Sequence, residues 1–327
     1  MERKVTKKAF ITLGLIFVLF VMIPSAAFSW NQATHAYISE RLGARVGHDN
    51  LSEMWGSVGP DLFNFIFDSD VCPGWISDQT HGTYSETFMK VWNAASTKSE
   101  KPLAYGFLTH NQAWGADFTA HVSGSTFGQE EGYIITKAKL LLTTPCPANH
   151  DQTFGDAFAS FGMDPDEGLL VAHLISEYAI DIMLRNDVDP LIGRKLATAA
   201  RDMTKRFPAL LTKAFAKDYA DQCFSGDASA AADVLTAAEK VHRKNMIFLG
   251  QAISQSKPVA MQLLAEQVVG VLSDFLGGPL LVPEAEAIEI IKAAIYSSMT
   301  ICNDYRAEID ATIEFVGKNL EDHGITY

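Results

Sequence analysis

Histidines and acidic residues recur in short sets through the first two thirds of the chain. Asp61 follows a Gly-Pro turn, and His81 closes the segment Asp-Gln-Thr-His. Imidazole and carboxylate groups together are the donors that zinc, manganese and iron take in proteins. The sequence therefore predicts a metal site, and the side chains that can contribute to it are those of His35, Asp61, His81, His110, Asp117, His121, His173 and Glu177.

Two of these sets have helical spacing. If the segment around Asp117 is a helix, His110, Asp117 and His121 lie within about 40° of one another on one stripe. His173 and Glu177 stand one turn apart in the pattern H-x-x-x-E. Each set alone has an ordinary alternative, a polar helix face or a surface pair. Their combination is more specific than either.

Residues 1–29 have the pattern of a secretory signal peptide. Four basic residues precede an apolar run at 9–23, and small residues precede a cut after Ser29. The alternative, an uncleaved anchor, is disfavoured because the apolar run is short for a membrane span. We therefore expect an exported protein that begins at Trp30, whose free amino group and carbonyl oxygen add two candidate ligands.

Charge and cysteine content limit the possible partners and covalent links of the protein. The net charge is −13, and removing four basic residues and one acidic residue with the signal peptide makes it −16. An acidic chain is poorly suited to electrostatic capture of nucleic acid or anionic membrane. Four cysteines in an exported protein allow up to two disulfides, with three pairings open: Cys72, Cys146, Cys223 and Cys302.

The ordered set from Trp30 to Glu177 resembles the zinc-dependent phospholipase C superfamily. That superfamily includes bacterial phospholipases C, single-strand-specific zinc nucleases and the catalytic domain of glycosylphosphatidylinositol-specific phospholipase D. The segments Gly56-Ser-Val-Gly-Pro-Asp61 and Ser77-Asp-Gln-Thr-His81 look most like the phospholipase D branch. The resemblance covers roughly residues 30–185, and residues 190–327 resemble nothing in it.

The resemblance implies three zinc ions and a division of the ligands among them. The first ion would take Asp61, His81, His110 and Asp117. The second would take the Trp30 amino and carbonyl groups, His35 and a bridging Asp117, and the third His121, His173 and Glu177. A hydroxide between the close pair would attack phosphorus, and the third ion would stabilise the leaving oxygen. Asp61 would also orient the nucleophile as a base.

His110 departs from the family pattern. The family helix has His and Asp four residues apart, whereas here seven residues separate His110 from Asp117. On a regular helix His110 would lie about 4.5 Å further along the axis. A distortion near Gly115 would correct this. His150 is expected to be a bystander on a loop, and its alternative role is that of a substitute ligand.

The elements that position these residues are predicted to be helices throughout, which gives an all-α fold. Expected helical segments are 31–42, 83–94, 103–121, 166–184, 191–219, 230–256, 259–276 and 284–320. Segments 56–79 and 123–165 are expected to be loops. The predicted organisation is a signal peptide (1–29), a catalytic domain (30–188) and a helical C-terminal region (189–327) that is a second domain or part of the same globule.

Three functions remain open at this point. The first is an exported zinc-dependent phosphodiesterase acting on a phospholipid or another phosphodiester, with transient contact to a membrane surface. The second uses the same site on single-stranded nucleic acid, which the acidic charge disfavours. The third is a non-enzymatic helical protein that binds a structural metal or a partner. The apolar runs 259–276 and 285–301 predict a buried helical hairpin rather than a membrane-docking element.

Overall fold

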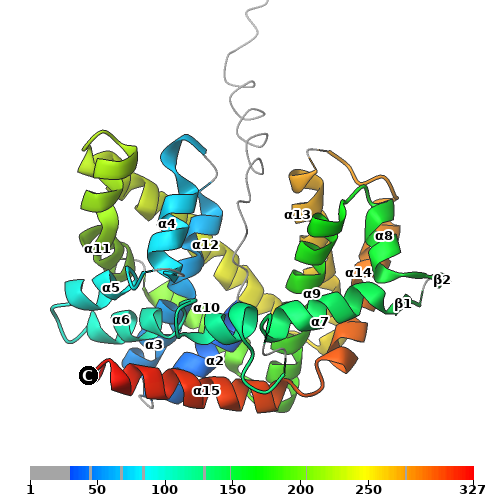
Figure 1. Cartoon of the computed structure of the whole chain (residues 1–327), viewed down its shortest axis with the longest axis horizontal. Helices are drawn as coiled ribbons and strands as arrows, with labels where there is room; N and C mark the ends of the chain where they lie inside the picture. The colour runs from blue at the N-terminus through cyan, green and yellow to red at the C-terminus, as the bar shows by residue number, and fades with distance from the viewer. Residues whose placement is uncertain are drawn as a thin grey trace, which may run out of the picture.

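The computed structural model describes residues 30–327, except 44–45, 67–68, 83–84, 128–129, 148, 204 and 277, and it does not describe the side chains of residues 69, 149, 150, 274 and 275. The predicted signal peptide and the side chain of His150 therefore lie outside the described residues. Helices dominate the described chain, which confirms the all-α prediction (Figure 1).

Most helices before residue 190 are short, with α9 as the exception, and several are separated by irregular segments. They are α2 (Gln32–Gly43), α3 (His48–Val58), η1 (Gly59–Phe65), η2 (Ser69–Val71), α4 (Pro73–His81), α5 (Met89–Ala94), α6 (Lys101–Leu108), the π-helix η3 (Phe118–Val122), α7 (Tyr133–Thr143), α8 (Phe154–Ser160) and α9 (Pro165–Asp187). Between α7 and α8, β1 (Pro145–Cys146) pairs antiparallel with β2 (Asn149–Thr153).

Most helices after residue 190 are longer, with α10 as the exception. They are α10 (Ile192–Asp202), α11 (Arg206–Cys223), α12 (Ala228–Ile253), α13 (Lys257–Phe275), α14 (Glu284–Ile301) and α15 (Tyr305–Asp322). Helix α12 packs on η1, α14 on α9, and α15 on α2. One hydrophobic core cluster contains residues from Trp30 to Ile325, so the C-terminal helices share a core with the segment that carries the predicted ligands.

The sequence explains the start of α9, the longest helix among those carrying predicted ligands. Asp164 accepts hydrogen bonds from the backbone of Asp166 and Glu167, and the Glu167 carboxylate accepts one from Asp164 N. This capping box and Pro165 at the first helical position satisfy donors that would otherwise lack partners. The helix therefore has a fixed start, two turns before His173.

Several predicted boundaries are wrong. The expected helix 103–121 is interrupted after Leu108, and 83–94 contains only the short helix α5. The expected loops 56–79 and 123–165 contain helices, because local caps and turns such as the Thr153–Asp156 capping box start helices within polar sequence. Segments 191–219 and 284–320 each divide into two helices.

Helices α13 and α14 form the expected hairpin. They contact each other and α9, and they bury Leu264, Val268, Ile291 and Ile295. In the described part of the chain, no helix combines the length and the apolarity needed to cross a membrane.

Helices α3 and α6 cross with their backbones in direct contact. A Cβ on Gly106 would lie 1.9 Å from the carbonyl oxygen of Glu53, and one on Gly56 would lie 2.1 Å from that of Leu103. Only glycine permits this approach. The crossing places the C-terminal end of α6, which leads to His110, beside the end of α3, which leads to Asp61.

We expect Gly106→Ala to lower the free energy of unfolding by about 1–3 kcal/mol or more, because the added methyl group meets backbone rather than a movable side chain. The matched control is Gly270→Ala in α13, where the added Cβ meets nothing within 4 Å. The control is expected to gain roughly 0.5–1 kcal/mol. Chemical denaturation measures both, and an unchanged stability of Gly106→Ala would contradict the close crossing.

Candidate metal centre

The structure brings eight of the nine predicted ligand residues together in three groups. In each group the donor atoms lie within 4.8 Å of one another. The groups are His35, His110 and Asp117; Asp61, His81 and His110; and His121, His173 and Glu177. All eight side chains are buried except that of His121, which is partly exposed. Buried His and Asp clusters of this kind can hold metal ions.

The group around His81 has the dimensions of a tetrahedral site. His81 Nε2 lies 3.1 Å from His110 Nε2 and 3.5 Å from Asp61 Oδ1. His110 Nε2 lies 3.7 Å from Asp61 Oδ1. Four ligands at roughly 2.0–2.1 Å around a tetrahedral ion lie about 3.3 Å apart. The separations between these atoms are therefore close to those that a zinc-sized ion requires.

The Asp117 carboxylate faces two groups at once. Its Oδ1 lies 3.2 Å from His35 Nε2, whereas its Oδ2 lies 3.4 Å from His110 Nε2 and 3.6 Å from His81 Nε2. The His35 and His110 rings stack with centroids 4.1 Å apart. Two oxygens directed at different imidazoles are the arrangement of a carboxylate that bridges two cations.

The third group is built on α9 and η3. His173 Nε2 lies 2.8 Å from Glu177 Oε1 and 3.1 Å from His121 Nε2. His173 and Glu177 share one face of α9 because they are one turn apart. His121 reaches them from the π-helix η3, a type of segment that occurs frequently at functional sites.

A wide backbone turn brings His110 beside Asp117, so the two are not on one helix. The Asn111 side chain accepts hydrogen bonds from the backbone N–H groups of Ala113, Trp114 and Gly115. The Asp117 N–H donates to the His110 carbonyl at 2.7 Å, which closes the turn. A Cβ on Gly115 would lie 2.5 Å from the His110 and Asn111 backbone. The distortion expected near Gly115 is present.

Backbone carbonyls fix the orientation of two imidazoles. His110 Nδ1 lies 2.7 Å from the Ser57 carbonyl and His81 Nδ1 lies 3.1 Å from the Ser77 carbonyl. A carbonyl only accepts, so both Nδ1 atoms carry the proton. Both Nε2 atoms are then acceptors in the neutral rings, and they face each other at 3.1 Å. Two lone pairs at this distance repel unless a cation or a proton lies between them.

His81 also shows a local error in the prediction. The predicted helix 83–94 places His81 just before a helix, but His81 is the last residue of α4, and Gly82 follows with a left-handed backbone at φ +62°. Gly82 N–H donates to the Asp78 carbonyl and ends the helix. His81 is therefore held at a helix C-terminus, where its ring reaches the Ser77 carbonyl one turn earlier.

Two residues outside the predicted ligand set support the ligands. Gln32 Nε2 donates to Asp61 Oδ2 at 2.7 Å, which fixes the plane of that carboxylate. Asp181 is buried and accepts from Ala33 N at 3.2 Å, Thr34 N at 2.9 Å and Thr34 Oγ1 at 2.8 Å. Asp181 thus ties α9 to the first turn of α2, which carries His35. Gln32 lies three residues before His35, and this helical spacing was the available signal.

The electrostatics of the centre follow from burial of opposite charges. Burial opposes the charged form of His110, yet Asp117 and Asp61 raise its pKa to about 9. Burial opposes ionisation of Asp61, but His110 and His81 lower its pKa to about 2. Asp117 is likewise held well below its usual pKa by His110, against the effect of burial. The ionised carboxylates of Asp61 and Asp117 are therefore stabilised by positive charge within the cluster.

In the third group, nearby opposite charges do not offset the effect of burial on the pKa values. Burial lowers the pKa of His121 to about 4 and that of His173 well below its usual range. Burial raises the pKa of Glu177 well above its usual range, with Asp61 and Asp181 adding to the effect. Neutral imidazoles are in the protonation state that binds a metal ion, whereas the Glu177 carboxyl group would release its proton when an ion binds.

Unsatisfied polar atoms provide a test of whether metal fits. Among the described residues, both ring nitrogens of His35, both carboxylate oxygens of Asp117 and Asp61 Oδ1 are buried without a hydrogen-bond partner. Such groups are costly unless something else satisfies them. They converge on the same positions as the ligand groups, so the residues present fit bound cations.

Trp30 lies at the entrance to α2, and its side chain is held in the core. Its ring stacks on Tyr133 with centroids 5.3 Å apart, and its Nε1 donates to Thr119 Oγ1 at 3.2 Å. Asn31 O accepts from His35 N at 3.0 Å, so Trp30 directly precedes the turn that carries His35. The predicted role of its amino and carbonyl groups stays a prediction.

The C-terminal helix α15 supports the segment around His121. Glu308 is buried and accepts from the backbone N–H groups of Ser125, Thr126 and Phe127, at 2.6 Å for Thr126 and 3.2 Å for Phe127. Thr312 Oγ1 lies 2.8 Å from Thr119 Oγ1, the acceptor of the Trp30 indole. Helix α15 therefore contacts both ends of the π-helix that carries His121.

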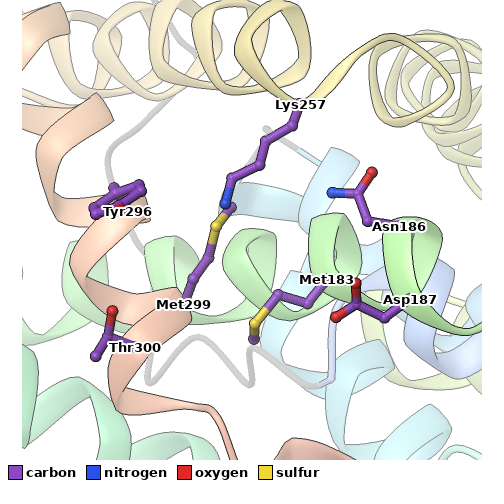
Figure 2. A pocket seen from close by; sticks show the side chains of 7 residues that line it. All are labelled: Met183, Asn186, Asp187, Lys257, Tyr296, Met299 and Thr300. Atoms are coloured by element: carbon purple, nitrogen blue, oxygen red, sulfur yellow. The ribbon is translucent and has the colours of Figure 1, made fainter.

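A surface cavity of about 440 Å³ lies apart from these groups, between the end of α9, the start of α13 and α14 (Figure 2). The Lys257 ammonium lies 5.2 Å from the centroid of the Tyr296 ring. None of the seven residues that line the cavity belongs to the three ligand groups.

Comparison of the chain with protein-family models, with curated proteins and with solved structures finds no match. The interpretation of the centre therefore depends on its own geometry.

We expect Asp181→Ala to weaken the binding of divalent metal by roughly 10- to 100-fold, because the first turn of α2 loses the acceptor that positions His35. Competition with a chelator measures the affinity. The control is Asp166→Ala, which removes an exposed acid from the same helix. Metal affinity like that of the unchanged chain in Asp181→Ala would show that Asp181 does not position the site.

We expect Glu308→Ala to lower the free energy of unfolding by about 3 kcal/mol, because it leaves several backbone N–H groups near His121 without their acceptor. Glu314→Ala, an exposed acid on the same helix, is the control and is expected to change little. Denaturant titration measures both variants. Equal midpoints for the two variants would contradict the supporting role of Glu308.

Proposed function

We propose that the chain is a zinc-dependent phosphodiesterase of phospholipase C type. The observation that carries the proposal is the placement of Asp117, whose two oxygens face His35 on one side and His81 with His110 on the other. A third group, of His121, His173 and Glu177, completes the set. A structural site needs four ligands around one ion, whereas this arrangement offers a bridging carboxylate and separate groups.

The donor set favours zinc over calcium and magnesium. The eight ligands are five imidazoles and three carboxylates, and none of the groups contains a thiolate. Calcium and magnesium prefer all-oxygen sites, so the histidines argue against them. The near-tetrahedral separations around His81 support zinc in particular.

Each of the eight candidate ligands has a defined role in this proposal. His35, His81, His110, Asp61 and Asp117 would hold a close pair of ions, and His121, His173 and Glu177 would hold a third. When bound, the ions supply Lewis acidity, which lowers the pKa of water and neutralises phosphate charge. Asp61 is fixed by Gln32 through Oδ2, so it can accept the proton of an attacking water in a constant orientation.

Charge favours a phospholipid over a polynucleotide as the substrate. The chain carries −13 overall, and a polyanionic single strand would lose affinity through repulsion. A phospholipid brings one phosphodiester and an apolar body. We therefore propose a phospholipid substrate, with a single-stranded nucleic acid as the alternative that the assay must exclude.

The proposal includes export and removal of residues 1–29. The free amino group of Trp30 would then be a ligand beside His35, which the turn of α2 makes geometrically reasonable. Determination of the N-terminal residue of the exported protein tests this part. A first residue other than Trp30 would remove the ligand pair, and the second ion with it.

We expect Asp117→Ala to bind at least two fewer zinc ions per chain and to lose activity by more than 100-fold, because one carboxylate serves two groups. Asp310→Ala, an exposed acid on α15, is the control and should retain both zinc and activity. Metal analysis and a chromogenic phosphodiester assay measure the two quantities. Loss of a single ion from Asp117→Ala would contradict the bridging role.

The substrate class is tested with phosphatidylcholine vesicles and a single-stranded oligonucleotide, each incubated with the zinc-loaded protein. Release of a phosphorylated head group from the vesicles, with the oligonucleotide intact, is the expected result. Cleavage of the oligonucleotide alone would replace the phospholipase proposal with the nuclease one. No hydrolysis of either substrate by protein that holds zinc would favour a non-enzymatic metal-binding protein.

A further inference from the structure

Two of the four cysteines lie beside each other, although they are far apart in the sequence. Cys72 precedes α4, and Cys223 is the last residue of α11. The Cys223 thiol is hydrogen-bonded to Cys72. Their neighbours also meet, since the Tyr219 hydroxyl donates to the Val71 carbonyl and the Tyr219 ring stacks on Trp75 with centroids 5.2 Å apart at 4°.

The other two cysteines are in different places. Cys146 in β1 lines a cavity with Glu286 and Glu289, near the start of α14. Cys302 follows the other end of α14 and lies near Tyr133. Cys302 follows Glu286 by sixteen positions, which correspond to roughly 24 Å along a helix. A disulfide requires Cα atoms about 4.4–6.8 Å apart, so Cys146 and Cys302 do not meet this requirement.

We propose that Cys72 and Cys223 form an intramolecular disulfide, and that Cys146 and Cys302 stay reduced. The reaction is oxidation by a small-molecule disulfide through thiol–disulfide exchange. The two thiols lose two electrons and two protons to form the S–S bond, and the reagent gains them and becomes two thiols. This inference is independent of the proposed phosphodiesterase function.

Accessibility supports the same assignment. Cys72 and Cys223 are partly exposed, whereas Cys146 and Cys302 are buried. A soluble reagent therefore reaches the first pair and is excluded from the second. Burial and the contact with Cys72 raise the pKa of the Cys223 thiol to about 12.

The bridge would restrain the part of the chain that carries two predicted ligands. Cys72 lies between η1, which carries Asp61, and α4, which ends at His81. A bond to Cys223 would attach this segment covalently to α11. Since the bond closes a long loop, it restricts the unfolded chain more than the folded one and raises stability.

The pairing is tested by tryptic mapping without reduction. The purified full chain is equilibrated with oxidised glutathione, alkylated in denaturant and digested. Cleavage after Lys and Arg places each cysteine in its own peptide: 46–90, 140–185, 218–240 and 293–306. The expected result is a linked pair of 46–90 with 218–240, together with alkylated 140–185 and 293–306. Any other linked pair, or four alkylated cysteines, would overturn the proposal.

Thermal unfolding gives a second readout that does not depend on peptide recovery. Oxidation is expected to raise the Tm of the chain by roughly 5 °C relative to the reduced form. Cys146→Ser should keep both the linked peptides and this shift, whereas Cys72→Ser should lose both. An equal shift in Cys72→Ser would assign the effect to another cysteine and reject the proposed bond.

Discussion

The rest of the centre depends on one constraint, the full burial of the Asp117 carboxylate among imidazoles. A buried carboxylate is expensive in a low-dielectric interior unless positive charge lies against it. In the protein without cations, protonation of His110 supplies part of that charge, as its raised pKa indicates. Bound cations would supply it more completely, and one of them would also satisfy His35 Nε2, which has no hydrogen-bond partner among the described residues. The need for positive charge beside Asp117 and the geometry of the ligands therefore both favour bound cations.

The backbone around the ligands is irregular because the ligands approach from several directions. Asp61 lies in a 3-10 helix, His110 in a turn, and His121 in a π-helix. A regular helix presents donors along one stripe only, and so cannot surround an ion from every side. The long helices lie mainly in the C-terminal region, which contributes core residues and none of the predicted ligands. Local departures from regular structure are expected at sites with a function.

The fold class could be predicted because helical periodicity depends on residue type and order, and eight of the nine candidate ligands named from the sequence lie close together in the structure. The route of the chain between ligands could not be predicted. Segment 103–121 has helical periodicity, but the Asn111 side chain caps three N–H groups and the glycine at 115 permits a tight approach. The partners of Asp181 could not be predicted either, because Ala33 and Thr34 are about 150 positions away. Nothing local in the sequence marks such a pair.

The C-terminal region is part of the environment of the centre, although it contributes none of the predicted ligands. The His242 ring, from α12, lies 5.4 Å from Trp55 and 5.1 Å from Phe65 between ring centroids, next to the helix that carries Asp61. Burial lowers the pKa of His242 to about 4, so a neutral ring packs there. On the opposite side, α15 holds Thr119 and the loop after His121. Removing residues 189–327 would expose both flanks of the centre, so this region and the ligand-bearing segment form one structural unit.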